Sequence, residues 1–184
     1  MRKFPTALTA VIGVLAVSVV LITGIWLLGT RTGFEPAPQG DQLGPDAGES
    51  AQEYAQRASI SMRSAPGDEP AFALVTFSPA LSAEEAADVL EPIGRVNAIL
   101  PPESHPLPVG EGDRAHNFTV ATEEDLAGVV VWDTGDALRQ IADNERVWSV
   151  EALPPDAVWG AFAIRPVDTL GVNCEGDGVM LRRA

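Results

Sequence analysis

The sequence predicts an α+β domain carried on a single N-terminal transmembrane helix. Two patterns lead to this prediction. An uncharged apolar run extends from Phe4 to Thr30, and the later chain alternates short β-type runs with helical repeats of Ala, Leu and Ile. The chain has 184 residues, of which 46% are hydrophobic and 21% charged. That length leaves room for one modest domain beside the anchor.

Residues 7–28 are expected to form the anchor, because a bilayer core about 30 Å thick needs about 20 apolar residues in a helix. The alternative is a cleaved signal peptide, whose apolar core is shorter and is followed by small residues. Here Trp26, Leu27 and Leu28 occupy the would-be cleavage region. The pattern therefore favours a retained anchor, with residues 1–33 as the transmembrane unit.

Charges beside the apolar run predict its orientation and exclude one class of partner. Arg2 and Lys3 precede the run and outweigh Arg31 after it, which favours a cytoplasmic N-terminus and an extracytoplasmic C-terminal domain. The formal net charge is −14, and all 26 acidic residues lie at or after Glu35. Such a domain repels phosphate backbones, so nucleic-acid binding is not expected. The expected location is the cell membrane, as a single-pass protein held in the lipid bilayer by its N-terminal helix.

Composition divides the rest of the chain into four parts. Residues 34–48 are rich in Pro, Gly and Asp and predict a flexible linker. Residues 49–66 predict an amphipathic stalk helix and a turn, and residues 67–168 the α+β domain, with a polar tail at 169–184. The helix should pack against the domain or against a second copy of itself, through a thin apolar stripe of Ala51, Tyr54, Ala55, Ala58 and Met62.

The first half of the domain predicts a strand, a helix and a second strand. Residues 72–77 form a compact β-type run, and residues 95–100 form another. Between them, Ser82 followed by Glu85 matches a capping box, which predicts a helix start. Residues 101–112 contain four prolines and predict an exposed loop.

The second half repeats this order. Residues 117–121 predict a third strand, Thr122 with Asp125 predicts a helix start, and the apolar run 127–132 leads into helical spacing at 137–144. The final predicted strands span residues 147–153 and 158–164. Strand-helix-strand twice, plus one strand, is the βαββαβ order of a ferredoxin-like fold, with both helices on one face of the sheet.

The span from Phe72 to Leu153 resembles the ferredoxin-like propeptide and inhibitor domains of subtilisin-type proteases. The likeness rests on an opening strand, a helix, and a late helix leading into a strand of the form V-x-x-V-E, here carried by Leu138, Ile141, Val147, Val150 and Glu151. The resemblance implies the fold. It also implies an alternative function as a cell-surface enzyme regulator, such as a protease-inhibitor-like module. The tail after the last strand has no evident substrate-like inhibitory segment.

No residue is assigned a catalytic, cofactor-binding or metal-binding role. His105 and His116 have no metal-ligand spacing and are expected in solvent, and Cys174 is a lone thiol. The tail run 173–178 resembles half of an EF-hand loop, but the twelfth position is Ala184 rather than Glu. G-x-S-x-G elbows and glycine-rich phosphate loops are absent from the sequence. The protein is therefore not expected to be an enzyme or to need a cofactor.

The remaining candidates are acidic pairs and tryptophans. Glu84–Glu85 and residues 123–125 are expected in the first turns of helices, where they interact favourably with the helix dipole. Trp132, Trp148 and Trp159 are expected in the core, whereas a tryptophan on an exposed sheet face would mark a partner site. The resulting hypothesis is a non-enzymatic extracytoplasmic interaction domain that binds a protein partner or a second copy of itself.

Overall fold

An α+β arrangement with four helices and a five-stranded antiparallel sheet is formed by residues 40–102, 104–165 and 167, which are the residues that the computed structural model describes. All of them belong to the second of two units of the chain, residues 37–184. In chain order, the elements are β1 (Gln42–Leu43), α2 (Ala51–Ser64), β2 (Pro70–Leu81), α3 (Ala83–Val89), β3 (Arg95–Leu100), β4 (Leu107–Pro108), α4 (Arg114–Ala121), β5 (Leu126–Thr134), α5 (Gly135–Ala142), β6 (Val147–Ala152) and β7 (Ala163–Ile164).

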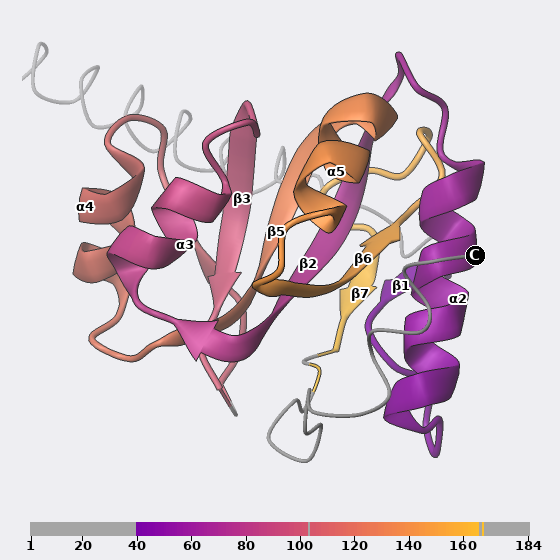
Figure 1. Cartoon of the computed structure of the whole chain (residues 1–184), viewed down its shortest axis with the longest axis horizontal. Coiled ribbons are helices and arrows are strands. Elements are labelled where there is room, and N and C mark those ends of the chain that lie inside the picture. Colours follow the sequence, from indigo (N-terminus) through magenta and orange to yellow (C-terminus); the bar gives the residue numbers. More distant parts are fainter. Residues whose placement is uncertain (1–39, 103, 166, 168–184) are drawn as a thin grey trace, which may run out of the picture. The chain divides into compact units, whose positions relative to one another are not determined.

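The large sheet has the strand order β4-β3-β5-β2-β6 and is antiparallel throughout (Figure 1). The long strands β2 and β5 pair over most of their length, with Phe72 opposite Trp132. The short strands β1 and β7 pair in parallel as a separate two-stranded sheet. Strands β5 and β2 therefore lie inside the sheet, where both of their faces can be buried.

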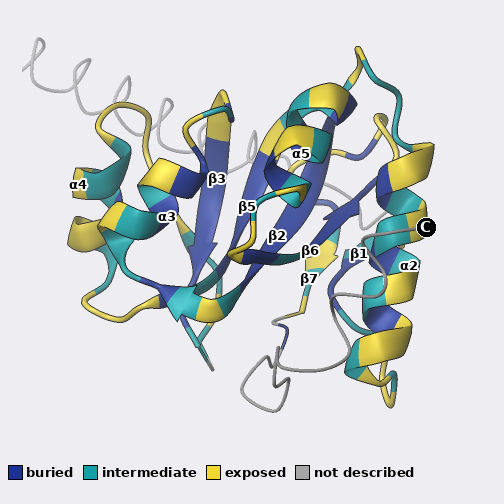
Figure 2. Ribbon diagram, viewed as in Figure 1, coloured by how far each residue is buried: buried dark blue, intermediate teal, exposed yellow. Residues whose placement is uncertain are grey.

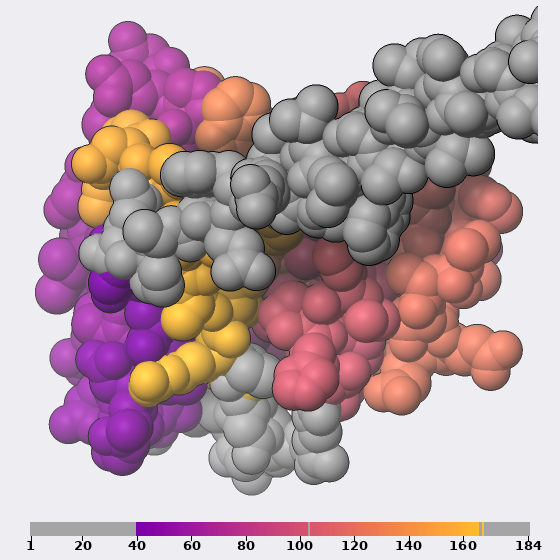
Figure 3. Space-filling view, turned by 180° about the vertical axis from the view of Figure 1, so that it is seen from behind, coloured from indigo at the N-terminus to yellow at the C-terminus, as the bar shows by residue number. Residues whose placement is uncertain are grey.

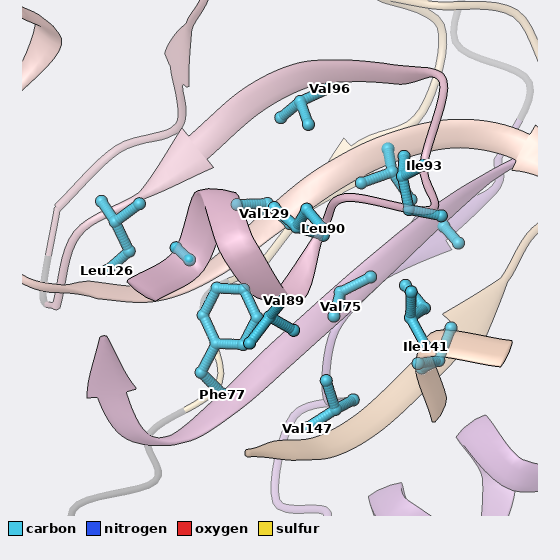
Figure 4. Packing of buried hydrophobic residues seen from close by; sticks show 14 of the residues in the cluster. Val75, Phe77, Val89, Leu90, Ile93, Val96, Leu126, Val129, Ile141 and Val147 are labelled. Atoms are coloured by element: carbon cyan, nitrogen blue, oxygen red, sulfur yellow. The ribbon is translucent and has the colours of Figure 1, made fainter. Parts of the chain in front are cut away.

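The first face of the sheet carries α3 and α5. Leu90, which follows α3, and Ile141 on α5 are buried against valines and Phe77 of the strands (Figure 4). Helix α4 adds Phe118, which is fully buried in the same cluster. Burial of these apolar side chains supplies the main driving force for packing the helices on this face.

Helix α2 lies along the outer edge of β6 rather than on one face. Tyr54 and Ala58 of α2 pack in the cluster on the second face, whereas Met62 packs in the cluster on the first. At the edge itself, the Ala152 N–H donates to the Ser61 hydroxyl at 3.1 Å. The helix therefore covers an edge strand that would otherwise offer open hydrogen-bonding groups.

The second face is covered by the β1–β7 pair and by the segment after β6. The buried residues of this cluster come from β1, from α2, from the strands of the large sheet and from the segment after β6. They are Leu43, Tyr54, Ala58, Phe72, Leu74, Ala98, Leu100, Val130, Leu153, Ala157 and Val167. Figure 2 shows the strands largely buried and the exposed residues on the outer sides of helices and in turns. Both faces of the sheet are thus occupied by the chain itself.

The strands expected at 72–77, 95–100 and 147–153 and the helices expected at 49–62 and after Ser82 are confirmed. Strands lie at 70–81, 95–100 and 147–152, and a helix begins after Ser82 with the complete capping box. The amphipathic segment is helical at 51–64, and this helix also begins with a capping box, between Ser50 and Glu53. These segments carry strong local signals, a β-type run or a cap followed by apolar spacing, and their tertiary contacts agree with those signals.

The strand expected at 117–121 is wrong, because these residues belong to helix α4. The helix begins after Asp113, whose carboxylate accepts from the His116 N–H at 3.0 Å. The helix start expected at Thr122 is wrong as well. The Thr122 hydroxyl instead accepts from the Glu124 N–H at 3.1 Å, which makes a turn, so residues 123–125 lie in a turn before β5.

The apolar run 127–132, expected to lead into a helix, is the centre of strand β5. It is flanked by β2 and β3, so nearly every side chain from Leu126 to Val131 is buried on one face or the other. A strand buried on both faces shows no alternation, and periodicity cannot separate it from a buried helix. The second helix, α5, begins only at Gly135, after the Thr134 cap.

Three further expectations are corrected in part. The strand expected at 158–164 is reduced to β7, Ala163–Ile164, and it pairs outside the main sheet. The expected linker 34–48 contributes β1, whose Leu43 is fully buried. The loop 101–112 contains the two-residue strand β4 at the sheet edge.

Several expectations fall outside the described residues. They are the anchor at 7–28, the first part of the linker at 34–39, and the tail at 169–184 with Cys174. Among the helices that the structure describes, none combines the length and apolar character needed to cross a membrane.

Candidate interaction surface

Four aromatic rings gather on the second face of the sheet. Phe72 lies at their centre, with ring centroids 6.5 Å from Trp132, 5.6 Å from Trp159 and 5.2 Å from Phe162. Trp159 and Phe162 meet edge to face at 5.8 Å. Tilted and edge-on contacts of this kind are favourable for aromatic rings. We call these four residues together with Val158 the aromatic patch.

The aromatic patch is partly open to solvent. Trp132 is 40% exposed, Trp159 38% and Val158 48%. Among the described residues, the other large hydrophobic side chains with such exposure are Ile60 on α2 and Val120 on α4, each on a different helix. Scattered exposed apolar residues need no explanation, but a group of them with aromatic rings indicates a contact surface.

Two parts of the fold build the aromatic patch. Phe72 and Trp132 are cross-strand partners on β2 and β5, and Trp132 is also paired with Arg95 on β3. Val158, Trp159 and Phe162 come from the segment after β6, which a 2.9 Å hydrogen bond from the Ala161 N–H to the Val158 carbonyl shapes into a turn. Seen from behind, this segment (yellow) lies between β1 and α2 (indigo and purple) and the β3 region (pink) (Figure 3).

A buried ionic network lies beside the aromatic patch. Oε2 of Glu151 on β6 accepts from the Gly44 N–H at 2.6 Å and from the Tyr54 hydroxyl at 3.2 Å, and Oε1 accepts from Arg57. Arg57 also donates to the Gly44 carbonyl at 2.9 Å and to both oxygens of Glu49. One strand carboxylate therefore holds the β1 loop and helix α2 together.

Burial dominates the electrostatics of this network. The side chain of Glu151 is only 4% exposed, and burial raises the pKa of its carboxyl. The hydrogen bonds from Gly44, Arg57 and Tyr54 offset this only in part. Burial likewise raises the pKa of Tyr54, whereas the hydrogen bond with Glu49 raises that of Arg57. The hydrogen bonds of Glu151 all come from Gly44, Tyr54 and Arg57 of the domain itself, so the network has a structural role.

At Gly44, both the backbone conformation and a close neighbouring carbonyl require glycine. Its φ is +96°, and an added Cβ would lie 2.0 Å from the Arg165 carbonyl oxygen. We expect Gly44→Ala to lower the free energy of unfolding by about 2–4 kcal/mol, since a left-handed backbone and an overpacked contact both add cost. Urea denaturation of the full chain in mild detergent, followed by tryptophan fluorescence, measures this.

Gly48→Ala is the matched control for that change. Gly48 also has a positive φ, +84°, but nothing lies within 4 Å of an added Cβ. It should cost only about 1 kcal/mol, from the backbone alone. Equal losses in the two variants would show that the close approach of Gly44 to β7 does not constrain the fold.

The pH dependence of stability follows from three carboxylates. The hydrogen bond from Arg57 lowers the pKa of Glu49, and the hydrogen bonds of the Ser50 and Ser82 caps lower the pKa values of Glu53 and Glu85. A lowered pKa gives stability that is present above the ordinary value of 4.5 and lost as the pH falls. We therefore expect the urea midpoint to fall as the pH drops below 4.5.

Glu151 acts in the opposite direction. Its raised pKa gives a contribution that is fully present below the ordinary value and is lost as the pH rises through the raised one.

Ser82→Ala removes a cap that lowers the pKa of Glu85 and should flatten the acid limb of the pH profile. A urea midpoint that does not fall below pH 4.5 would show that the three lowered carboxyls do not control stability in acid, because the contribution of Glu151 is already complete there.

Apart from the aromatic patch, a small hollow lies between the start of β3 and α4. It has a volume of about 210 Å³ and includes Arg95, Glu111 and Arg114 in its lining. Ligand pockets commonly occupy about 300–1,000 Å³. Arg114 donates to the carbonyls of Leu90 and Ile93, and burial lowers its pKa. Its guanidinium is therefore used to close the C-terminal end of α3.

The two histidines considered from the sequence lie apart on the surface, whereas two of the three tryptophans meet around Phe72. His105 is exposed in the loop before β4, and His116 is exposed on α4. In residues 40–102, 104–165 and 167, no three His, Cys, Asp or Glu side chains are grouped as metal ligands would be. The expected core position of all three tryptophans is wrong for Trp132 and Trp159, which are exposed, whereas Trp148 stacks on Tyr54 at 5.9 Å.

Neither the partners of these tryptophans nor the ionic network around Glu151 could be predicted from local sequence patterns. Phe72 and Phe162 are 90 positions apart and meet only because the segment after β6 folds back over the sheet. One available signal was the run from Pro154 to Gly160, whose turn residues argue against a continuous strand there. Comparison with known proteins finds no match for the chain among protein-family models, curated proteins or solved structures.

Proposed function

We propose that this protein is a single-pass membrane protein that presents a non-enzymatic interaction domain outside the cytoplasm, with the aromatic patch as its docking surface. The observation that carries the proposal is the patch itself. Trp132, Val158 and Trp159 are exposed together on a domain whose other large apolar side chains are mostly buried. The apolar run at 7–28 and its flanking charges support the anchor and its orientation.

The domain is proposed to be a ferredoxin-like fold with additions. The order β2-α3-β3-β5-α5-β6, with the sheet order β3-β5-β2-β6, supports this assignment. The additions are α2 at the sheet edge, the β1–β7 pair on the second face, and β4 with α4 between β3 and β5. A protease-inhibitor-like role is less well supported, because the tail after the last predicted strand has no evident substrate-like inhibitory segment.

Cysteine labelling in intact cells tests the proposed topology. Cys174 is the only cysteine, so Cys174→Ala gives a background for single new cysteines. Glu124→Cys, at an exposed turn, should react with a membrane-impermeant maleimide in intact cells. Phe4→Cys should react only after permeabilisation. The reverse pattern, or a chain recovered in the soluble fraction, would overturn the proposal.

A further inference from the structure

We infer that the aromatic patch docks on the interfacial region of the same bilayer that holds the anchor. The inference rests on the proposed function, because it requires residues 7–28 to lie in that bilayer. It names the partner of the docking surface as lipid and leaves a protein partner as an outcome of the test. Four steps support it: where the chain joins the domain, how far the connection reaches, what the patch is made of, and how small it is.

The chain joins the domain directly beside the aromatic patch. The carbonyl of Asp41, at the beginning of the described chain, accepts from the Ala163 N–H at 3.0 Å. Ala163 follows Phe162, whose ring lies 5.2 Å from that of Phe72. The N-terminal connection therefore meets the domain one residue from a member of the patch.

The connection between anchor and domain is short. Residues 30–40 can span at most about 35 Å when fully extended. The patch is thus confined close to the bilayer, which raises the effective concentration of lipid around it. Even a weak intrinsic affinity of the patch for lipid then suffices for docking, because the anchor has already restricted the translational freedom of the domain.

The composition of the patch suits a membrane interface. Tryptophan combines an apolar ring system with an N–H donor and is enriched where apolar and wet regions meet. Val158 and Trp159 lie in the turn closed by the Ala161 N–H, and both are partly exposed there. Arg95, the cross-strand partner of Trp132, adds a cation that can meet a lipid phosphate.

Size argues for lipid over a protein partner. Stable protein–protein interfaces involve about 20–30 residues on each side. The aromatic patch has five residues, of which Trp132, Val158 and Trp159 are exposed. A tethered domain needs no larger area to rest on a bilayer. The net charge of −14 adds a restriction, since an acidic domain is repelled by anionic lipid and should prefer zwitterionic membranes.

Fluorescence quenching by spin-labelled lipid tests the inference on the full chain in phosphatidylcholine vesicles. Trp26→Phe and Trp148→Phe leave Trp132 and Trp159 as the only tryptophans. Their emission should shift to the blue and be quenched more by a label near the headgroup than by one deep in the acyl chain. Anionic lipid mixed into the vesicles should reduce this quenching.

A matched control places the only tryptophan away from the patch. Val120→Trp, on the exposed side of α4 and in a chain otherwise lacking tryptophan, should escape quenching. Circular dichroism confirms that each variant is folded. Adding Trp159→Phe to the chain that carries Trp26→Phe and Trp148→Phe should remove part of the quenchable emission, which gives an independent reading.

The two proposals fail in different ways. A chain that does not float with the vesicles overturns the proposed anchor. A chain that floats while Trp132 and Trp159 stay unquenched overturns lipid docking alone and assigns the aromatic patch to a protein partner. Quenching of Val120→Trp to the same extent would also overturn docking through the patch, because it would mean that the domain meets lipid without preference.

Discussion

Replacing Glu151 by Leu should lower the free energy of unfolding by about 3–5 kcal/mol, since removing one member of a buried ion pair leaves the other uncompensated. The change removes the acceptor of the Gly44 N–H, the Tyr54 hydroxyl and Arg57 at the same time. Arg57 is 36% exposed and keeps Glu49 as a partner, so the loss should lie toward the lower end. Urea denaturation of the full chain in mild detergent measures it.

A double-mutant cycle separates the ion pair from simple packing. Arg57→Met in the Glu151→Leu background removes the uncompensated charge and should recover part of the lost stability. Arg146→Ala is the matched control, because its pair with Glu85 at 3.2 Å is exposed on both sides and should contribute little to stability. If Glu151→Leu cost no more than Arg146→Ala, the network would not be what holds α2 and β1 to the sheet.

Truncating Phe77 to Ala should lower the free energy of unfolding by about 3–5 kcal/mol, the usual cost of emptying a buried aromatic site. Phe77 lies on β2 and is fully buried, with Val89 of α3 and Val147 of β6 close by (Figure 4). Strand and helix meet at this point, so the cavity cannot close without moving both. The same urea titration gives the loss.

Val120→Ala provides the comparison for Phe77. Val120 is an apolar residue of α4 with 72% exposure, so its truncation should change the free energy of unfolding by less than about 0.5 kcal/mol. A small effect at Phe77 would mean that α3 and α5 are held on the sheet by something other than the cluster around this ring.

Local signals were sufficient where a segment carries its own start and its own period. Ser82 and Glu85 form a capping box within four residues, and the structure contains both of its hydrogen bonds. Leu138 and Ile141 of α5 share one helical face and are both buried. Such features depend on neighbours in sequence, so no distant partner can reverse them easily.

Local signals failed between residues 114 and 134. The Asp113 cap of α4 was overlooked, whereas Thr122 resembled a cap but makes a turn with Glu124. The apolar run 127–132, expected to lead into a helix, is a strand at the centre of the sheet, and such a strand buries both faces and loses its alternation. Only pairing with β2 and β3 distinguishes the two structures, and those strands lie far away in the sequence.

The candidate site was even less accessible to sequence reasoning. Trp132 and Trp159 were recognised as residues that mark either a core or a contact surface, but the choice between these depends on what covers them. Phe72 contacts both tryptophan rings and Phe162 contacts that of Trp159, and Trp132 and Trp159 remain 40% and 38% exposed. Exposure is a property of the assembled surface, which no single segment encodes.

The sequence by itself determined the α+β class, the helices α2 and α3 and the strands β2, β3 and β6, because each depends on neighbouring residues. Tertiary structure alone decided that residues 126–134 are a strand and that α2 covers an edge. It also decided that Glu151 is buried against Arg57 and that four aromatic rings form one patch. These features join residues up to 94 positions apart, and the free energy that selects them comes from contacts that exist only after the chain has folded back on itself.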